Sequence, residues 1–124
     1  MVKLGLVTNS VTPTETTSDP RWGAGGGTNL LTNQVTPGGN YATSGPTIAN
    51  NTYTLASATV TFDGDNISIL QDAANPNNAR WGIGWDDTAA GDQALFFLDL
   101  GGVTDLSAGD FSVTWNASGI FTLT

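Results

Sequence analysis

Apolar residues in this chain recur at every second position rather than at helical spacing. The segment Val2–Val7 alternates in this way, and Arg80–Asp86 places Trp81, Ile83 and Trp85 on one side. Such alternation predicts strands with one buried face. No window of about eleven residues keeps an i, i+3, i+4, i+7 apolar pattern free of glycine and proline, so we expect no helix.

The same pattern predicts most strands of the second half. We expect them over residues 53–62, 66–71, 80–86, 93–100, 111–115 and 120–124. In the first of these, the alternate positions that are apolar switch from odd to even residue numbers near Ala56–Ser57. We interpret this switch as a bulge. Gln93–Leu100 is apolar on both sides, which predicts a central strand covered on both faces.

Turn residues separate these strands. Asp63–Asn66 predicts a hairpin turn, and Asn116–Gly119 predicts a second hairpin between the last two strands. About seven strands, with a turn every 8–12 residues or so, predict an all-β fold of antiparallel strands, either a β-sandwich or a small barrel.

A long glycine- and proline-rich stretch, residues 9–51, precedes the strand-rich part, residues 52–124. It contains four of the five prolines and is longer than the loops of compact domains usually are. Two interpretations stay open: short strands lie within it, for example near Leu30–Val35, or it is an arm ordered by neighbouring subunits. The 124 residues predict a single domain.

Charge narrows the possible partners. Eleven acidic residues against three basic ones give a net charge of −8. A negative domain repels phosphate backbones and anionic lipids, so we expect neither nucleic-acid nor membrane binding. The first residues alternate like a strand and are too short an apolar run for a signal peptide, so we expect synthesis in a cytoplasm.

The usual carriers of catalytic chemistry are missing. The chain has no histidine, no cysteine and one glutamate, Glu15. The remaining candidates for a carboxylate pair lie at expected turns or strand ends, where aspartate is favoured for backbone reasons; they are Asp63, Asp65, Asp86, Asp87, Asp99, Asp105 and Asp110. Asp63–Asn66 lacks the spacing of a calcium loop. We therefore predict no enzyme, no catalytic residue, no metal and no cofactor.

The aromatic residues divide into two groups. Trp81, Trp85 and Trp115 lie in alternating strands, which predicts core positions. Trp22 lies beside Arg21 in the irregular stretch, and tryptophan, tyrosine and arginine are the residues that dominate protein interfaces. For Trp22 and Arg21, and less strongly for Tyr41, we weigh a subunit contact against packing in the chain's own core.

Several long segments of the chain resemble a family of small structural proteins of tailed bacteriophages. They are DPRWGAGG (residues 19–26), VTPGGNY (35–41), NARWGI (78–83), VTDLSAGD (103–110) and TWNASGIF (114–121). The likeness extends from the first strand to the last. It implies a virion component and brings no catalytic residues with it.

Two functions follow as expectations. The first is a capsid cement or decoration protein on the virion surface, bound to the major capsid protein and to copies of itself in a symmetric homo-oligomer such as a trimer. The second is an adhesion module associated with a tail fibre or with receptor binding, since β-sandwiches readily carry such sites. The copy number per particle distinguishes them.

Overall fold

The computed structural model describes residues 1–124 and contains ten strands and one 3-10 helix of four residues. The predicted all-β class is confirmed: the strands form several sheets, none of which closes into a barrel, and the fold is sandwich-like. No helix in the structure has the length and apolar character needed to cross a bilayer. There are more strands than expected because the irregular stretch holds two and the segment 53–62 forms two rather than one.

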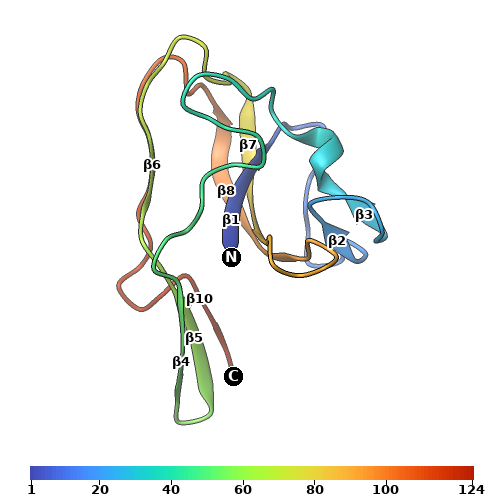
Figure 1. The fold of residues 1–124 in the computed structure, drawn as a ribbon, viewed down its shortest axis with the longest axis vertical. Coiled ribbons are helices and arrows are strands. Elements are labelled where there is room, and N and C mark those ends of the chain that lie inside the picture. The colour runs from blue at the N-terminus through green and yellow to red at the C-terminus, as the bar shows by residue number, and fades with distance from the viewer.

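An antiparallel sheet of three strands lies at the centre of the body (Figure 1). It consists of β1 (Val2–Val7), β7 (Ala79–Asp86) and β8 (Ala94–Thr104), in that order. The first two were expected from their alternation. The expectation that Gln93–Leu100 is central is wrong, because β7 occupies the middle and β8 the edge. The apolar residues on both sides of β8 are explained by the two faces of the sheet, each of which packs on its own cluster.

The two faces of this sheet carry different cores. Val2, Leu4 and Leu6 belong to the larger cluster, which also holds Phe62 and Phe111 from other strands. On the opposite face, the smaller cluster is formed by Val7, Trp22, Leu30, Ile83 and Trp85. The central sheet is therefore covered on both faces, whereas the period-2 pattern of the sequence predicted one buried face.

The irregular stretch packs against the body. It contains β2 (Pro20–Arg21) and β3 (Thr28–Asn29), which pair in parallel, followed by the 3-10 helix η1 (Leu30–Asn33). The helix stands where we considered a strand, and the side chain of Asn29 accepts a hydrogen bond from the backbone N–H of Leu31 at its start. The stretch also contributes side chains to the core that are at most 2% exposed: Trp22, Leu30, Val35, Tyr41 and Ile48.

A second sheet of three strands projects from the body (Figure 1). It is formed by β4 (Thr52–Ala56), β5 (Thr59–Asp63) and β10 (Phe121–Leu123), with β5 in the middle. The expected single strand over 53–62 with a bulge is wrong. Ser57 and Ala58 form a two-residue turn with φ values of 48° and 64°, the left-handed geometry of a type I′ hairpin.

The remaining strands, β6 (Ile67–Ile69) and β9 (Phe111–Val113), pair with each other. Neither expected hairpin is present. Asp63–Asn66 leads from the projecting sheet into the body. After β9 the chain makes a tight turn at Asn116–Gly119, and β10 then pairs with β5 instead of with β9. The paired residues are 42 to 63 positions apart in the sequence, and no local turn signal specifies these pairings.

Candidate interaction surface

The projecting sheet has one apolar and one polar face. Its register places Tyr53, Phe62 and Phe121 in one row across the three strands, and Leu55, Val60 and Leu123 in the next row toward the tip. The opposite face carries mainly threonines: Thr52, Thr54, Thr59, Thr61 and Thr122. Because side chains alternate between the faces of a sheet, this register fixes all six apolar residues on one side.

The row nearer the body is anchored in the core. The Phe62 side chain is fully buried, and its ring lies 4.8 Å from that of Tyr53 and 5.2 Å from that of Phe121, measured between centroids. The Phe121 ring in turn lies 5.8 Å from that of Phe96 on β8. These contacts join the projecting sheet to the larger core cluster, so the sheet is held at its base.

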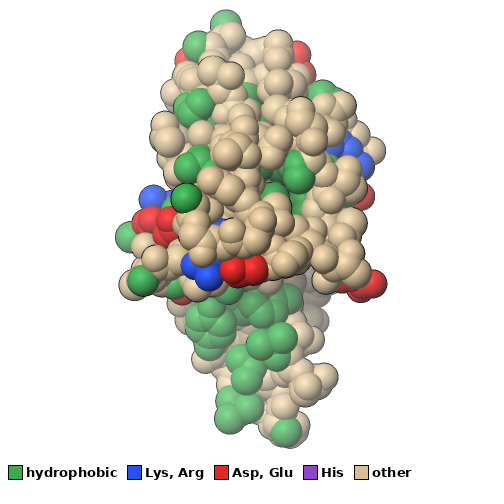
Figure 2. Space-filling model, turned by 90° about the vertical axis from the view of Figure 1, so that its right-hand side faces the viewer, with side chains coloured by type: hydrophobic (Ala, Val, Ile, Leu, Met, Phe, Trp, Pro, Cys, Tyr) green, Lys and Arg blue, Asp and Glu red, His purple; other side chains and the backbone are tan.

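Much of this face has no cover. In the outer row Leu55 is 70% exposed and Leu123 61%, while Val60 between them is half-buried. Tyr53, in the row nearer the body, is 57% exposed, and every residue of β4 is exposed. Figure 2 shows hydrophobic side chains gathered along the projection, below a body that carries the charged groups. Isolated exposed leucines are ordinary, but a contiguous apolar face on a sheet with a free edge strand indicates an interaction site.

The surface is also free of charge. Apart from Asp63 at the end of β5, the strands of the projecting sheet contain no acidic or basic side chain. The three basic side chains lie on the body, and each is paired with an acid: Lys3 with Asp87, Arg21 with Asp19, and Arg80 with Asp99. Apart from Asp63, all acidic and basic side chains therefore lie on the body.

Of the three expected interface residues, two have side chains inside the chain's own core. Trp22 stacks on Trp85 with 5.8 Å between ring centroids and lies against Gly5, where a Cβ atom would collide with the indole. Tyr41 is 1% exposed, and its hydroxyl accepts a hydrogen bond from the N–H of Leu6. In the structure both Trp22 and Tyr41 pack in the chain's own core, which was the alternative to a subunit contact.

Arg21 remains near the surface but is held within the chain. Its guanidinium contacts Asp19, and Nη1 donates to the Gly91 carbonyl at 3.5 Å. The next residue, Trp22, donates its backbone N–H to the carbonyl of Asp92. This short segment therefore ties the irregular stretch to the loop between β7 and β8.

Three of the seven aspartates considered for a catalytic pair cap turns. Oδ1 of Asp86, Asp99 and Asp105 accepts the N–H of the residue two positions later, at 2.9, 2.7 and 2.8 Å. A backbone hydrogen bond from Thr88 lowers the pKa of Asp86; a hydrogen bond from Arg80 lowers the pKa of Asp99. The Ser107 hydroxyl lowers the pKa of Asp105. A general acid needs a raised pKa, so these shifts favour the structural interpretation.

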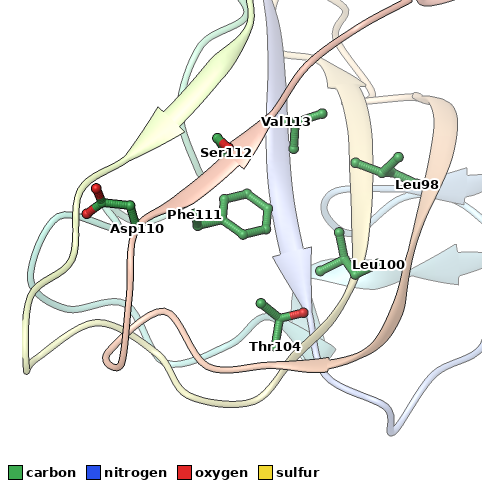
Figure 3. Close-up of a pocket in the computed structure, with 7 residues that line it drawn as sticks. All are labelled: Leu98, Leu100, Thr104, Asp110, Phe111, Ser112 and Val113. Carbon is green, nitrogen blue, oxygen red and sulfur yellow. The ribbon is translucent and has the colours of Figure 1, made fainter.

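An open groove of about 400 Å³ lies between β8 and β9 (Figure 3). Leu98 and Leu100 on β8 face Phe111 and Val113 on β9, and polar groups stand at its rim. The acid at the rim, Asp110, accepts the backbone N–H of Gln71 at 2.7 Å. The groove is thus a second, smaller apolar surface and holds no concentration of reactive groups.

Sequence reasoning missed the projecting surface, although one signal marks it. The change of apolar phase between Leu55 and Val60 brings both to the same face across a two-residue turn, and we interpreted it as a bulge. Comparisons of the chain with models of protein families, with curated proteins and with solved structures found no match.

Proposed function

We propose that this chain is a structural protein of a bacteriophage virion, namely a cement or decoration protein that binds the shell of major capsid protein. Support comes first from the resemblance carried by the five segments given above. The exposed apolar sheet adds a surface suited to permanent contact with other protein molecules.

The observation that carries the proposal is the unpartnered face formed by Tyr53, Leu55, Val60 and Leu123, which suits the contact between copies that a cement protein makes on a shell. An apolar edge sheet of this kind invites aggregation in a free protein, and natural proteins keep such a sheet only where something covers it. Asp86, Asp87 and Asp99, meanwhile, are engaged in turns and ion pairs on the body. The chain is therefore equipped to adhere to protein surfaces rather than to transform a substrate.

Adhesion of this kind stabilises a shell through linkage. A protein that binds assembled capsid subunits, and not dissociated ones, shifts the equilibrium toward the shell at every occupied site. The effect grows with occupancy and needs no chemistry beyond binding. The chain contains no cysteine, so its own fold does not depend on the redox state of the surroundings.

The proposal is tested with particles that lack this protein. We expect them to release DNA at a lower temperature, and after a milder osmotic shock, than complete particles do. Adding back the purified chain should restore resistance, whereas an unrelated acidic protein of similar size should not. Equal resistance with and without the chain would contradict a cementing role.

Quantifying the protein in purified virions decides between shell and tail. A copy number comparable with that of the major capsid protein agrees with a cement protein. A copy number comparable with that of a tail component would instead assign it to the adhesion function considered above.

A further inference from the structure

We propose that the apolar face of the β4–β5–β10 sheet packs against the same face of other copies of this chain, in a closed symmetric oligomer. This inference concerns contacts between copies and does not rest on the proposed role in a virion. It assigns the face formed by Tyr53, Leu55, Val60 and Leu123 to the oligomer, and leaves contact with any shell to other surfaces of the body.

Electrostatics favours this location for a contact between copies. Two chains that each carry a net charge of −8 repel each other over most of their surfaces. All eleven acidic side chains lie outside residues 52–62 and 120–124. The projecting sheet is therefore a place where two copies can meet without bringing acidic side chains into the contact.

Shape favours the same partner. Tyr53, Leu55, Val60 and Leu123 form a continuous apolar face on a twisted three-stranded sheet, and two such faces can interdigitate as the layers of a sandwich do. A symmetric contact uses the same patch on each copy, so the face needs no second type of surface to complement it.

The edge strand β4 borders this face. Its unpaired backbone groups are available to the same contact.

Two substitutions on the edge strand β4 test this directly. Leu55→Asp introduces a charge into the apolar face. Thr54→Asp introduces the same charge on the opposite face, at the adjacent and also exposed position of the same strand. Both side chains are exposed, so neither change removes core packing. Circular dichroism and thermal melting would verify that both variants fold.

Analytical ultracentrifugation or native mass spectrometry of the full chain gives the readout. We expect the wild type to form a symmetric oligomer, and Thr54→Asp to retain it. Leu55→Asp should weaken the association at least about 100-fold, because each copy would bury an uncompensated carboxylate. A monomeric wild type, or an oligomer that tolerates Leu55→Asp, would overturn the proposal.

Shell binding separates this inference from the proposed function. If the wild type is monomeric but binds purified shells, and Leu55→Asp abolishes that binding, the face belongs to the capsid protein and the self-association proposal fails. If the wild type forms the expected oligomer but binds no shell, the proposed function fails and the oligomer stands.

Discussion

The hydroxyl of Tyr41 accepts a hydrogen bond from the backbone N–H of Leu6 over 2.8 Å, within the core. Tyr41 belongs to the irregular stretch and Leu6 to the first strand of the central sheet, so this contact fixes one to the other. Leu6 is 0% exposed and Tyr41 1%, so water does not replace either partner of this hydrogen bond.

Replacing Tyr41 by Phe should therefore destabilise the protein. The ring still fills its site, but a buried N–H loses its acceptor, which costs about 1–3 kcal/mol. Urea unfolding followed by tryptophan fluorescence would measure the loss. Tyr53→Phe is the matched control, because the Tyr53 ring is largely exposed, and it should change the free energy of unfolding by less than about 0.5 kcal/mol. Equal effects of the two substitutions would contradict the role assigned to the Tyr41 hydroxyl.

The buried phenol of Tyr41 also makes the free energy of unfolding depend on pH in the alkaline range. Burial raises the pKa of its phenol to about 12, above its ordinary value of 10.0. Between these values the unfolded chain loses the proton and the folded one keeps it, so stability is full below about pH 10 and falls as the pH rises toward 12. The loss should reach about 2 to 3 kcal/mol.

Unfolding free energies measured at several pH values between 9 and 12 would show this slope. Tyr41→Phe should remove most of it. Tyr53→Phe should remove less, because the pKa of Tyr53 is raised by burial, and secondarily by the charge of Asp86, at a far more exposed site. An unchanged slope in Tyr41→Phe would show that other groups control the alkaline transition.

Much of the central sheet is predictable from the sequence because its signal is local. The alternation in β1 and β7 marks their buried faces, and each strand stands where the pattern places it. Gly5 is a weaker sign that a large group lies against the sheet, because a glycine within a strand often marks a close approach by another group. In the structure that group is Trp22. That signal names no partner, so the stacking of Trp22 on Trp85 could not be foreseen.

The projecting sheet was less predictable, for two physical reasons. The turn at Ser57 and Ala58 lacks the asparagine and glycine that usually mark a type I′ hairpin, so the sequence offers only a change of phase. The pairing of β10 with β5 joins distant segments, and hydrophobic periodicity does not encode which strands pair. The candidate surface depends on both features and emerged only from the structure.

The same turn leads to a stabilising substitution. Ala58 has a φ of 64°, a conformation that costs an L-residue about 1 kcal/mol and glycine almost nothing. Ala58→Gly should therefore strengthen the hairpin by about 0.5 to 1 kcal/mol, measured by hydrogen exchange of the β4 and β5 amides. Ala56→Gly, at a regular strand position of the same hairpin, should instead weaken it. Loss of protection in Ala58→Gly would contradict the turn geometry.

Trypsin can determine whether the irregular stretch is folded in a single chain. The sequence offers this protease three sites, Lys3, Arg21 and Arg80, and only Arg21 lies within residues 9–51. Because the Arg21–Trp22 segment is held by Asp19, Gly91 and Asp92, we expect its cleavage to be as slow as that after Arg80 in the central strand β7.

The experiment should use the Leu55→Asp variant, so that contacts between copies at the projecting sheet do not protect the site. Mass spectrometry of the fragments over time gives both rates in one sample. Rapid cleavage at Arg21 with Arg80 intact would show that neighbouring subunits order the stretch. Equal resistance at the two sites would show that the stretch belongs to the autonomous fold, which is the outcome we expect because Trp22 and Tyr41 are buried.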